Sequence, residues 1–155
     1  MKESSSQRVE QILQERNLKT EVIEFKELTR TAQEAATAIG CEIGRIAKTL
    51  IFKGKITGQP ICIIASGLNR IDEKKVEQYI GEGIEKADAA YVLKETTFAI
   101  GGVAPIGFEF PIKPLIDEDL MGYKELWAAA GTPHAVFRLS PEDLLRITQG
   151  KIVHI

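Results

Sequence analysis

The stretch Ile46-Ala47-Lys48-Thr49-Leu50-Ile51-Phe52 is a run of apolar and β-branched residues with one lysine in it. Such a composition is typical of a buried strand. A second apolar run, Pro60–Ala65, follows after the segment Gly54–Gly58. Because glycine favours turns, the segment Lys48–Lys53 and the second run are predicted to form a β-hairpin.

Lys48 needs an explanation, because a buried ammonium without a partner is costly. One interpretation is a lysine at the end of a strand whose amine reaches water along its own aliphatic stem. The other is a lysine whose charge meets an anion or a polarised carbonyl in a cleft. The stretch alone leaves both open.

The loop Gly101–Gly107 combines three glycines and a proline after the strand-like segment Thr97–Ile100. Glycine adopts positive φ and lets another backbone or a ligand approach closely, while Pro105 fixes its own φ and restricts Ala104. The loop is therefore either a tight turn between strands or a rim of backbone amides held ready for a ligand oxygen.

The remaining elements follow from apolar spacing and from capping residues. We expect helices at Ser5–Arg16, Thr31–Gly40 (with a Thr31/Glu34 capping box), Asp72–Ile80, Asp88–Lys94 and Ser140–Gln149, the last stopped by Gly150. We expect strands at Thr20–Phe25, Phe110–Ile116 (an edge strand, because of Pro111 and Pro114), Leu126–Ala129, Ala135–Leu139 and Lys151–Ile155. Short strands mixed with helices predict an α+β or mixed-barrel fold. With 155 residues and no linker, residues 1–155 are expected to form a single domain.

Composition limits the classes of function. A net charge of −2 and an isoelectric point near 5.8 argue against broad binding to nucleic-acid backbones, so any RNA contact must be local. The candidates for a local basic rim are Arg45, Lys48, Lys53, Lys55, Arg70, Lys74 and Lys75. No apolar run is long enough for a membrane span and the first residues lack a secretory signal, so we expect a cytoplasmic protein. Cys41 and Cys62 lack metal-ligand spacing and are expected to be buried thiols, with no metal and no cofactor.

Four segments in this order resemble the YbaK/prolyl-tRNA-synthetase-associated domains, a family of aminoacyl-tRNA editing domains. They are the helix at 31–40, the lysine strand at 46–52, the Gly-x-x-x-Pro loop at 101–105 and the segment 130–134. The resemblance runs from about Thr20 to Ile155. It implies the family's curved mixed β-sheet wrapped by helices. It also implies hydrolysis of the ester that joins a wrong amino acid to the terminal ribose of a tRNA.

The resemblance implies roles for particular residues. Lys48 and Gly101 would be catalytic, the lysine as a fixed positive charge and the glycine as part of a rim that stabilises an oxyanion. The residues expected to contact substrate are Thr49, Gly102, Val103, Ala104, Pro105, Gly131 and His134. Thr49 would face away from Lys48 on an ideal strand, and His134 could also be a structural hairpin residue. The implied partner is the acceptor end of an aminoacyl-tRNA, with a synthetase as a further candidate.

The segment around Gly131 differs from the glycine-, lysine- and arginine-rich stretch of the cysteine-specific subgroup. We therefore expect a small uncharged amino acid as the target. Two alternatives stay open: a non-catalytic module that binds aminoacyl-tRNA ends, nucleotides or a synthetase, and hydrolysis of an aminoacyl ester outside RNA.

Overall fold

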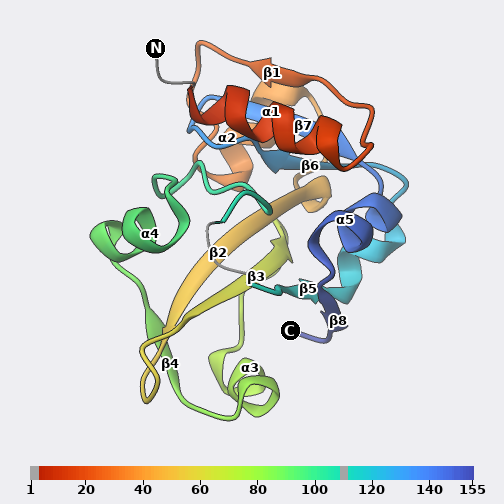
Figure 1. Cartoon of the computed structure of the whole chain (residues 1–155). Coiled ribbons are helices and arrows are strands. Elements are labelled where there is room, and N and C mark those ends of the chain that lie inside the picture. The colour runs from red at the N-terminus through yellow and green to blue at the C-terminus, as the bar shows by residue number, and fades with distance from the viewer. Residues whose placement is uncertain (1–3, 109–111) are drawn as a thin grey trace.

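Figure 1 shows a computed structural model of the chain, which describes residues 4–108 and 112–155. The α-helices in these ranges are α1 (Ser5–Glu15), α2 (Ala32–Ile39), α3 (Glu73–Ile80), α4 (Ala89–Thr96) and α5 (Pro141–Thr148). The strands are β1 (Val22–Glu24), β2 (Ile46–Gly54), β3 (Pro60–Ser66), β4 (Ile84–Lys86), β5 (Leu115–Asp117), β6 (Leu126–Ala129), β7 (Ala135–Leu139) and β8 (Lys151–Val153). Two 3-10 helices span Ile43–Arg45 and Glu118–Gly122.

The strands form one mixed sheet in the order β1-β7-β6-β2-β3-β5-β8, and β4 pairs with β2 beside this path. The pairs β2–β6, β3–β5 and β5–β8 are parallel, and the other pairs are antiparallel. The sheet stays open, with β1 and β8 at its two ends. The predicted α+β fold, a mixed sheet with helices around it, is confirmed.

β3 lies inside the sheet and is buried on both faces. Ile61 and Ile63 point to one face and belong to the apolar cluster that contains Val76 of α3. Cys62 and Ile64 point to the other face, where the main core also receives side chains from α1, α4 and α5. Successive side chains of a strand point to opposite faces, so an unbroken apolar run is what a strand covered on both sides requires.

The hairpin of β2 and β3 is confirmed, and β2 also has an opening along its other edge. β3 pairs with β2 from Ala47 to Lys53. On the other edge, β6 pairs only with Ile46 and Ala47, and β4 pairs only with Phe52, Lys53 and Gly54. The described strands therefore leave residues 48–51 paired on one side only, where β6 and β4 diverge.

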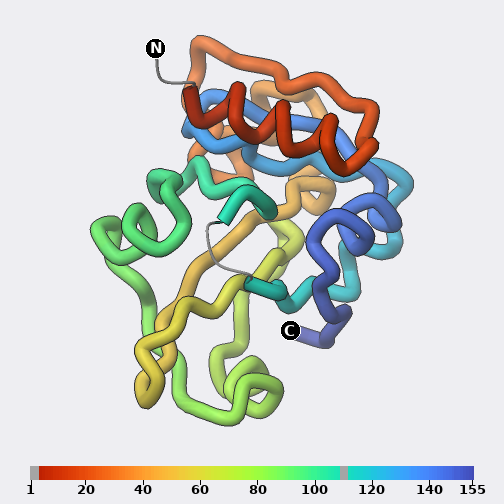
Figure 2. The backbone as a smooth tube through the Cα atoms, viewed as in Figure 1, coloured from red at the N-terminus to blue at the C-terminus, as the bar shows by residue number. Residues whose placement is uncertain are grey.

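The strand predicted at Thr97–Ile100 is wrong. Helix α4 continues to Thr96, and Thr97 closes it in the left-handed conformation with φ 67°. Phe98 is then buried in the core, and the guanidinium of Arg8 lies 4.7 Å from the centre of its ring. Burial of one large aromatic side chain, worth about 1.5–3 kcal/mol, turns this segment inward where its β-branched composition favoured a strand. Figure 2 traces the chain from α4 through this turn.

The strand predicted at Phe110–Ile116 needs two corrections. Phe110 and Pro111 lie outside the described residues, and the observed strand β5 begins at Leu115. It is not an edge strand, because β3 and β8 pair with it on either side. Prolines before a strand do not interrupt its ladder, which is why the expectation of an edge failed. Helix α5 ends in a left-handed Gln149 with φ 54°, one residue before the predicted stop at Gly150.

Candidate functional site

The glycine loop packs against the turn between β6 and β7. A Cβ on Gly102 would lie 2.5 Å from the backbone carbon of Thr132, so only glycine allows this approach. Gly101 adopts φ +87°, and a Cβ there would lie 3.0 Å from the Cβ of Arg30. The loop is therefore held between two backbone segments, the β6–β7 turn and the residues that lead into α2.

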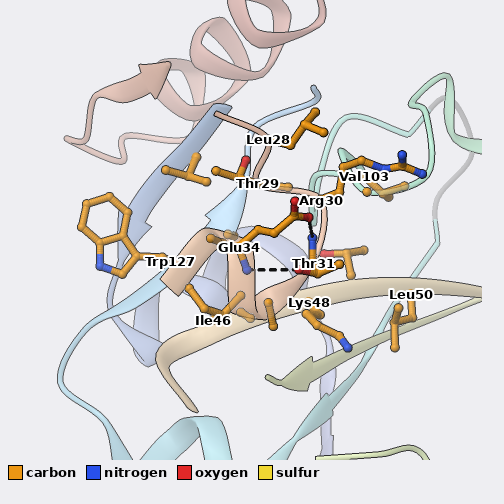
Figure 3. A pocket seen from close by; sticks show the side chains of 18 of the residues that line it. Leu28, Thr29, Arg30, Thr31, Glu34, Ile46, Lys48, Leu50, Val103 and Trp127 are labelled. Atoms are coloured by element: carbon orange, nitrogen blue, oxygen red, sulfur yellow. Dashed lines mark hydrogen bonds between the residues drawn. The ribbon is translucent and has the colours of Figure 1, made fainter. Parts of the chain in front are cut away.

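A cavity of about 400 Å³ opens where β2 lacks a neighbour. Its walls are the segment before α2, the first turns of α2, strands β2 and β6, and the loop at Gly101 (Figure 3). Most of the lining is apolar, with polar side chains in the minority, as is usual for a site that binds a small ligand. The residues that line it are Leu28, Thr29, Arg30, Thr31, Ala32, Glu34, Ala35, Ile46, Ala47, Lys48, Thr49, Leu50, Ile100, Gly101, Val103, Trp127, Ala128, Ala129 and Val136. We call this the first hollow.

A second hollow of about 550 Å³ continues from the first. The residues that line both are Lys48, Thr49, Leu50, Ile100, Gly101 and Val103. The second hollow adds Arg70, Glu73 and Lys86 as charged residues. Lys48 and Gly101 thus lie at the junction between the two hollows, where the chain brings the predicted lysine and the predicted glycine rim to one place.

Lys48 sits half-buried on the open edge of β2. Figure 3 shows its amine extending from β2 on the side of Leu50. No ion pair among the described residues involves this amine, so its charge is available to a ligand. Thr49 borders both hollows as well, although its side chain alternates with that of Lys48 on the strand, and its hydroxyl oxygen is buried.

Five of the residues expected at the site do not line either hollow: Gly102, Ala104, Pro105, Gly131 and His134. Ala104 and Pro105, in the middle of the loop, are buried. The backbone carbonyl of His134 accepts a hydrogen bond from the amide of Phe25 at 2.8 Å, and its Nδ1 lies 3.0 Å from the carbonyl oxygen of Glu27. In this arrangement His134 fastens the segment before α2 to the hairpin that forms the opposite wall.

A buried carboxylate supports the wall that carries Arg70. Asp117 is 2% exposed and accepts hydrogen bonds from the amide of Ser66 at 3.0 Å and from Nδ2 of Asn69 at 2.7 Å. Asn69 also donates to Asp119 at 2.7 Å. The position of the residue before Arg70 is therefore fixed by two acidic side chains, one from the last residue of β5 and one from the 3-10 helix that follows it.

Of the predicted basic rim, only Lys48 and Arg70 border the hollows. Arg45 instead lies over the ring of Tyr123 at 5.4 Å, and Lys53 over that of Tyr91 at 5.3 Å. Lys86 at the second hollow was not expected, since strand β4 that carries it was not predicted. Arg30 was not expected at the first hollow either, and Glu34 was expected only as a capping residue.

The two cysteines differ in their surroundings. Both are free thiols, but only Cys62 is buried, so the prediction of two buried thiols is wrong for Cys41. Burial raises the pKa of Cys62 to about 12, and partial burial raises that of Cys41. A thiol held neutral in this way is a poor nucleophile, and neither cysteine lines the two hollows.

Within residues 4–108 and 112–155, no helix is both long enough and apolar enough to cross a lipid bilayer.

The open mixed sheet thus carries two joined hollows, with a lysine and a glycine loop at their junction. The aminoacyl-tRNA editing domain family matches residues 26–147, and the chain belongs to this family. The resemblance noted from the sequence is thereby confirmed.

Relatives and solved structures agree with this assignment. The chain is 32% identical over 136 residues to the protein YwhH of Bacillus subtilis, covering 88% of this chain and 86% of that one. It is 31% identical over 128 residues to EbsC of Enterococcus faecalis, provisionally named a Cys-tRNA(Pro)/Cys-tRNA(Cys) deacylase, covering 81% and 76%. A match to the proline–tRNA ligase of Limosilactobacillus fermentum, 30% identical, covers 59% of this chain and 17% of the ligase. A crystal structure provisionally described as a trans-editing enzyme for prolyl tRNA synthetase has a TM-score of 0.91 at 41% identity, covering 99% of this chain and 98% of that one.

Proposed function

We propose that this protein is a trans-editing deacylase, which hydrolyses the ester between an amino acid and the terminal ribose of a mischarged tRNA. Its membership of the editing-domain family supports the substrate class. The observation that carries the proposal is the position of Lys48 and Gly101 at the junction of two hollows. An aminoacyl ester has an amino acid on one side and a nucleotide on the other, so the ester bond would lie at that junction.

The first hollow suits a small uncharged amino acid. Its wall includes five alanines, at positions 32, 35, 47, 128 and 129, and Val136. Small apolar side chains of this kind suit an amino acid whose own side chain is short and uncharged. Among the mischarged products of a synthetase, alanine and amino acids of similar size fit this lining best.

The second hollow suits the terminal nucleotide. Arg70 and Lys86 border it together with Lys48, and Glu73 is the acidic residue among them. A few local cations are enough to bind the phosphates of one or two nucleotides, even in a chain of net charge −2. The contact would be confined to the acceptor end, and the protein would act in the cytoplasm, where tRNA is charged.

The chemistry asks little of the side chains because an aminoacyl ester is already activated. A water oxygen attacks the carbonyl carbon, the bond from that carbon to the ribose oxygen breaks, and the ribose oxygen leaves with a proton. Negative charge develops on the carbonyl oxygen, and the Lys48 ammonium and the backbone amides of the loop at Gly101 are the groups placed to stabilise it. The packing that holds the loop between Arg30 and Thr132 limits its reorganisation during the reaction.

The experiment is a panel of tRNAs, each charged with a wrong amino acid, incubated with the purified protein. We expect release of a small uncharged amino acid, above all from mischarged tRNA(Pro), at a rate well above spontaneous hydrolysis. Correctly charged Pro-tRNA(Pro) is the control and should stay intact. If no member of a complete panel is turned over, the deacylase proposal is wrong, and a non-catalytic module that binds aminoacyl ends or a synthetase becomes the better account.

A further inference from the structure

The first hollow contains one carboxylate among its described lining residues, that of Glu34. The other charged residues of its wall are Arg30 and Lys48. Neither forms an ion pair with Glu34, because no nitrogen of theirs lies within 4.0 Å of its oxygens. Figure 3 shows the Arg30 guanidinium and the Lys48 amine both turned away from this carboxylate. A negative charge on the wall of a small apolar cavity is thus left without a cation from the described residues.

The carboxylate is also held in place. The amide of Thr31 donates to Oε1 of Glu34 at 3.1 Å, and the amide of Glu34 donates to Oγ1 of Thr31 at 3.0 Å (Figure 3). These two bonds form the capping box at the start of α2. Oε2 accepts no hydrogen bond from the described residues, so the capping box orients the group and leaves an acceptor open.

We propose that Glu34 binds the α-ammonium group of the aminoacyl substrate. This inference rests on the proposed function and names the part of the substrate that the first hollow recognises. The ammonium nitrogen of an aminoacyl ester is attached to the α-carbon, two bonds from the carbonyl carbon, on the amino-acid side of the ester. With the ester at the junction, the ammonium enters the first hollow, which Glu34 lines. Lys48 then remains to stabilise the carbonyl oxygen, on which negative charge develops.

This pairing makes a free amino group a condition for binding. An ester in which the ammonium is replaced by a hydroxyl or masked by an acyl group would bury the Glu34 carboxylate against an uncharged group. Leaving a partly buried charge without its partner is unfavourable, and a charge-assisted hydrogen bond contributes more than a neutral one. The protein would therefore spare peptidyl-tRNA and formylated initiator tRNA, whose amino groups are blocked.

Glu34→Gln tests the proposal cleanly, because glutamine also closes a capping box and removes only the charge. The substrates are alanyl-tRNA(Pro) and lactyl-tRNA(Pro), which differ by an ammonium against a hydroxyl. We expect the variant to lose about tenfold in kcat/KM on the alanyl ester and to change little on the lactyl ester, after correction for spontaneous hydrolysis. Equal effects on both esters, or no effect on either, would overturn the role of Glu34.

Thr31→Ala is the matched control, because it breaks the same capping box and keeps the carboxylate. It is expected to lower thermal stability more than Glu34→Gln does, while the wild-type preference for the alanyl ester persists. Loss of that preference in Thr31→Ala and its persistence in Glu34→Gln would assign the effect to the helix cap and contradict the proposal.

A binding measurement separates this inference from the proposed function. The probes are 3′-alanylamino-3′-deoxyadenosine and its 3′-lactoylamino counterpart, which are not esters and are not hydrolysed. We expect the wild-type protein to bind the alanyl probe about tenfold more tightly, and Glu34→Gln to bind the two alike. A protein that deacylates no tRNA but shows this preference would refute the deacylase activity alone, and a wild-type protein that binds both probes equally or neither would refute the role of Glu34.

Discussion

Replacement of Gly101 by alanine tests whether the loop at the junction needs the conformation that glycine provides. Gly101 has φ +87°, where an L-residue with a Cβ is strained by about 1–2 kcal/mol. The added Cβ would also lie 3.0 Å from the Cβ and Cγ of Arg30 and 3.2 Å from its Cα. Relief of such overpacking costs about 1–3 kcal/mol, and the lower chain entropy of unfolded alanine returns about 0.4–1 kcal/mol. We therefore expect Gly101→Ala to lower the free energy of unfolding by about 2–3 kcal/mol.

Two other glycines divide this effect into its parts. Gly40 has φ +82° and nothing within 4 Å of an added Cβ, so Gly40→Ala carries the backbone strain alone and should cost about 1 kcal/mol. Gly122 has neither a positive φ nor a near neighbour, and Gly122→Ala should leave stability within about 0.5 kcal/mol of the parent. Urea unfolding of the three variants gives these free energies, and deacylation of mischarged tRNA gives the activities. Only Gly101→Ala should lose activity under conditions where all three are folded. A Gly101→Ala protein as stable as Gly40→Ala, or as active as the parent, would refute the reasoning.

Three further predictions address the wall of the second hollow and the core. Arg70→Ala should raise the KM for tRNA about tenfold and reduce its salt dependence, whereas Lys74→Ala, which removes a charge outside the hollow, should change neither in steady-state kinetics. Asp117→Asn places an amide where three donors, from Ser66, Asn69 and Asp119, meet a buried carboxylate, so it should cost about 1–3 kcal/mol in urea unfolding. Asp119→Asn at the exposed surface should cost less than half of that. Burial raises the pKa of the Cys62 thiol from its ordinary value of 9.0 to about 12, so the stability that the neutral thiol contributes is intact below pH 9 and declines as the pH rises towards 12. Between pH 9 and 10 the parent should lose about 1 kcal/mol that Cys62→Ala does not lose, and identical pH slopes for the two proteins would contradict the assigned burial.

The helices and strands whose ends are set by neighbouring residues could be predicted from the sequence. The capping box of Thr31 and Glu34 and the left-handed Gly40 fix both ends of α2 through bonds within a few residues. The hairpin of β2 and β3 is equally local, because its turn is short and its two runs are apolar. In each case the residues that decide the structure lie within one turn or one strand of each other.

The rest depends on contacts between distant segments. Thr97 and Phe98 leave the predicted strand because the ring of Phe98 enters the core beside Arg8, about ninety residues away in the chain. β5 becomes an interior strand only because β8 pairs with it in parallel. No local pattern contains either fact.

The site divides in the same way. Lys48 and Gly101 stood out as unusual residues in their own segments, and the structure places them on the lining of the same hollows. Lys86 and Arg30 carry no local signal, because an exposed basic residue looks the same in any sequence until the fold sets it beside a cavity. Their roles, like the chemical roles of Lys48 and Gly101, remain predictions.

The central claim is that the positive charge of Lys48 stabilises the ester as it is cleaved. The most direct measurement is the single-turnover rate of deacylation of a mischarged tRNA by the wild-type protein, Lys48→Met and Lys48→Arg at saturating protein. Methionine keeps the length and apolar stem of the side chain and removes its charge, so Lys48→Met should be slower by about 10²–10³-fold, while Lys48→Arg should retain part of the rate. A Lys48→Met protein that is folded and cleaves the ester at the wild-type rate would contradict the account.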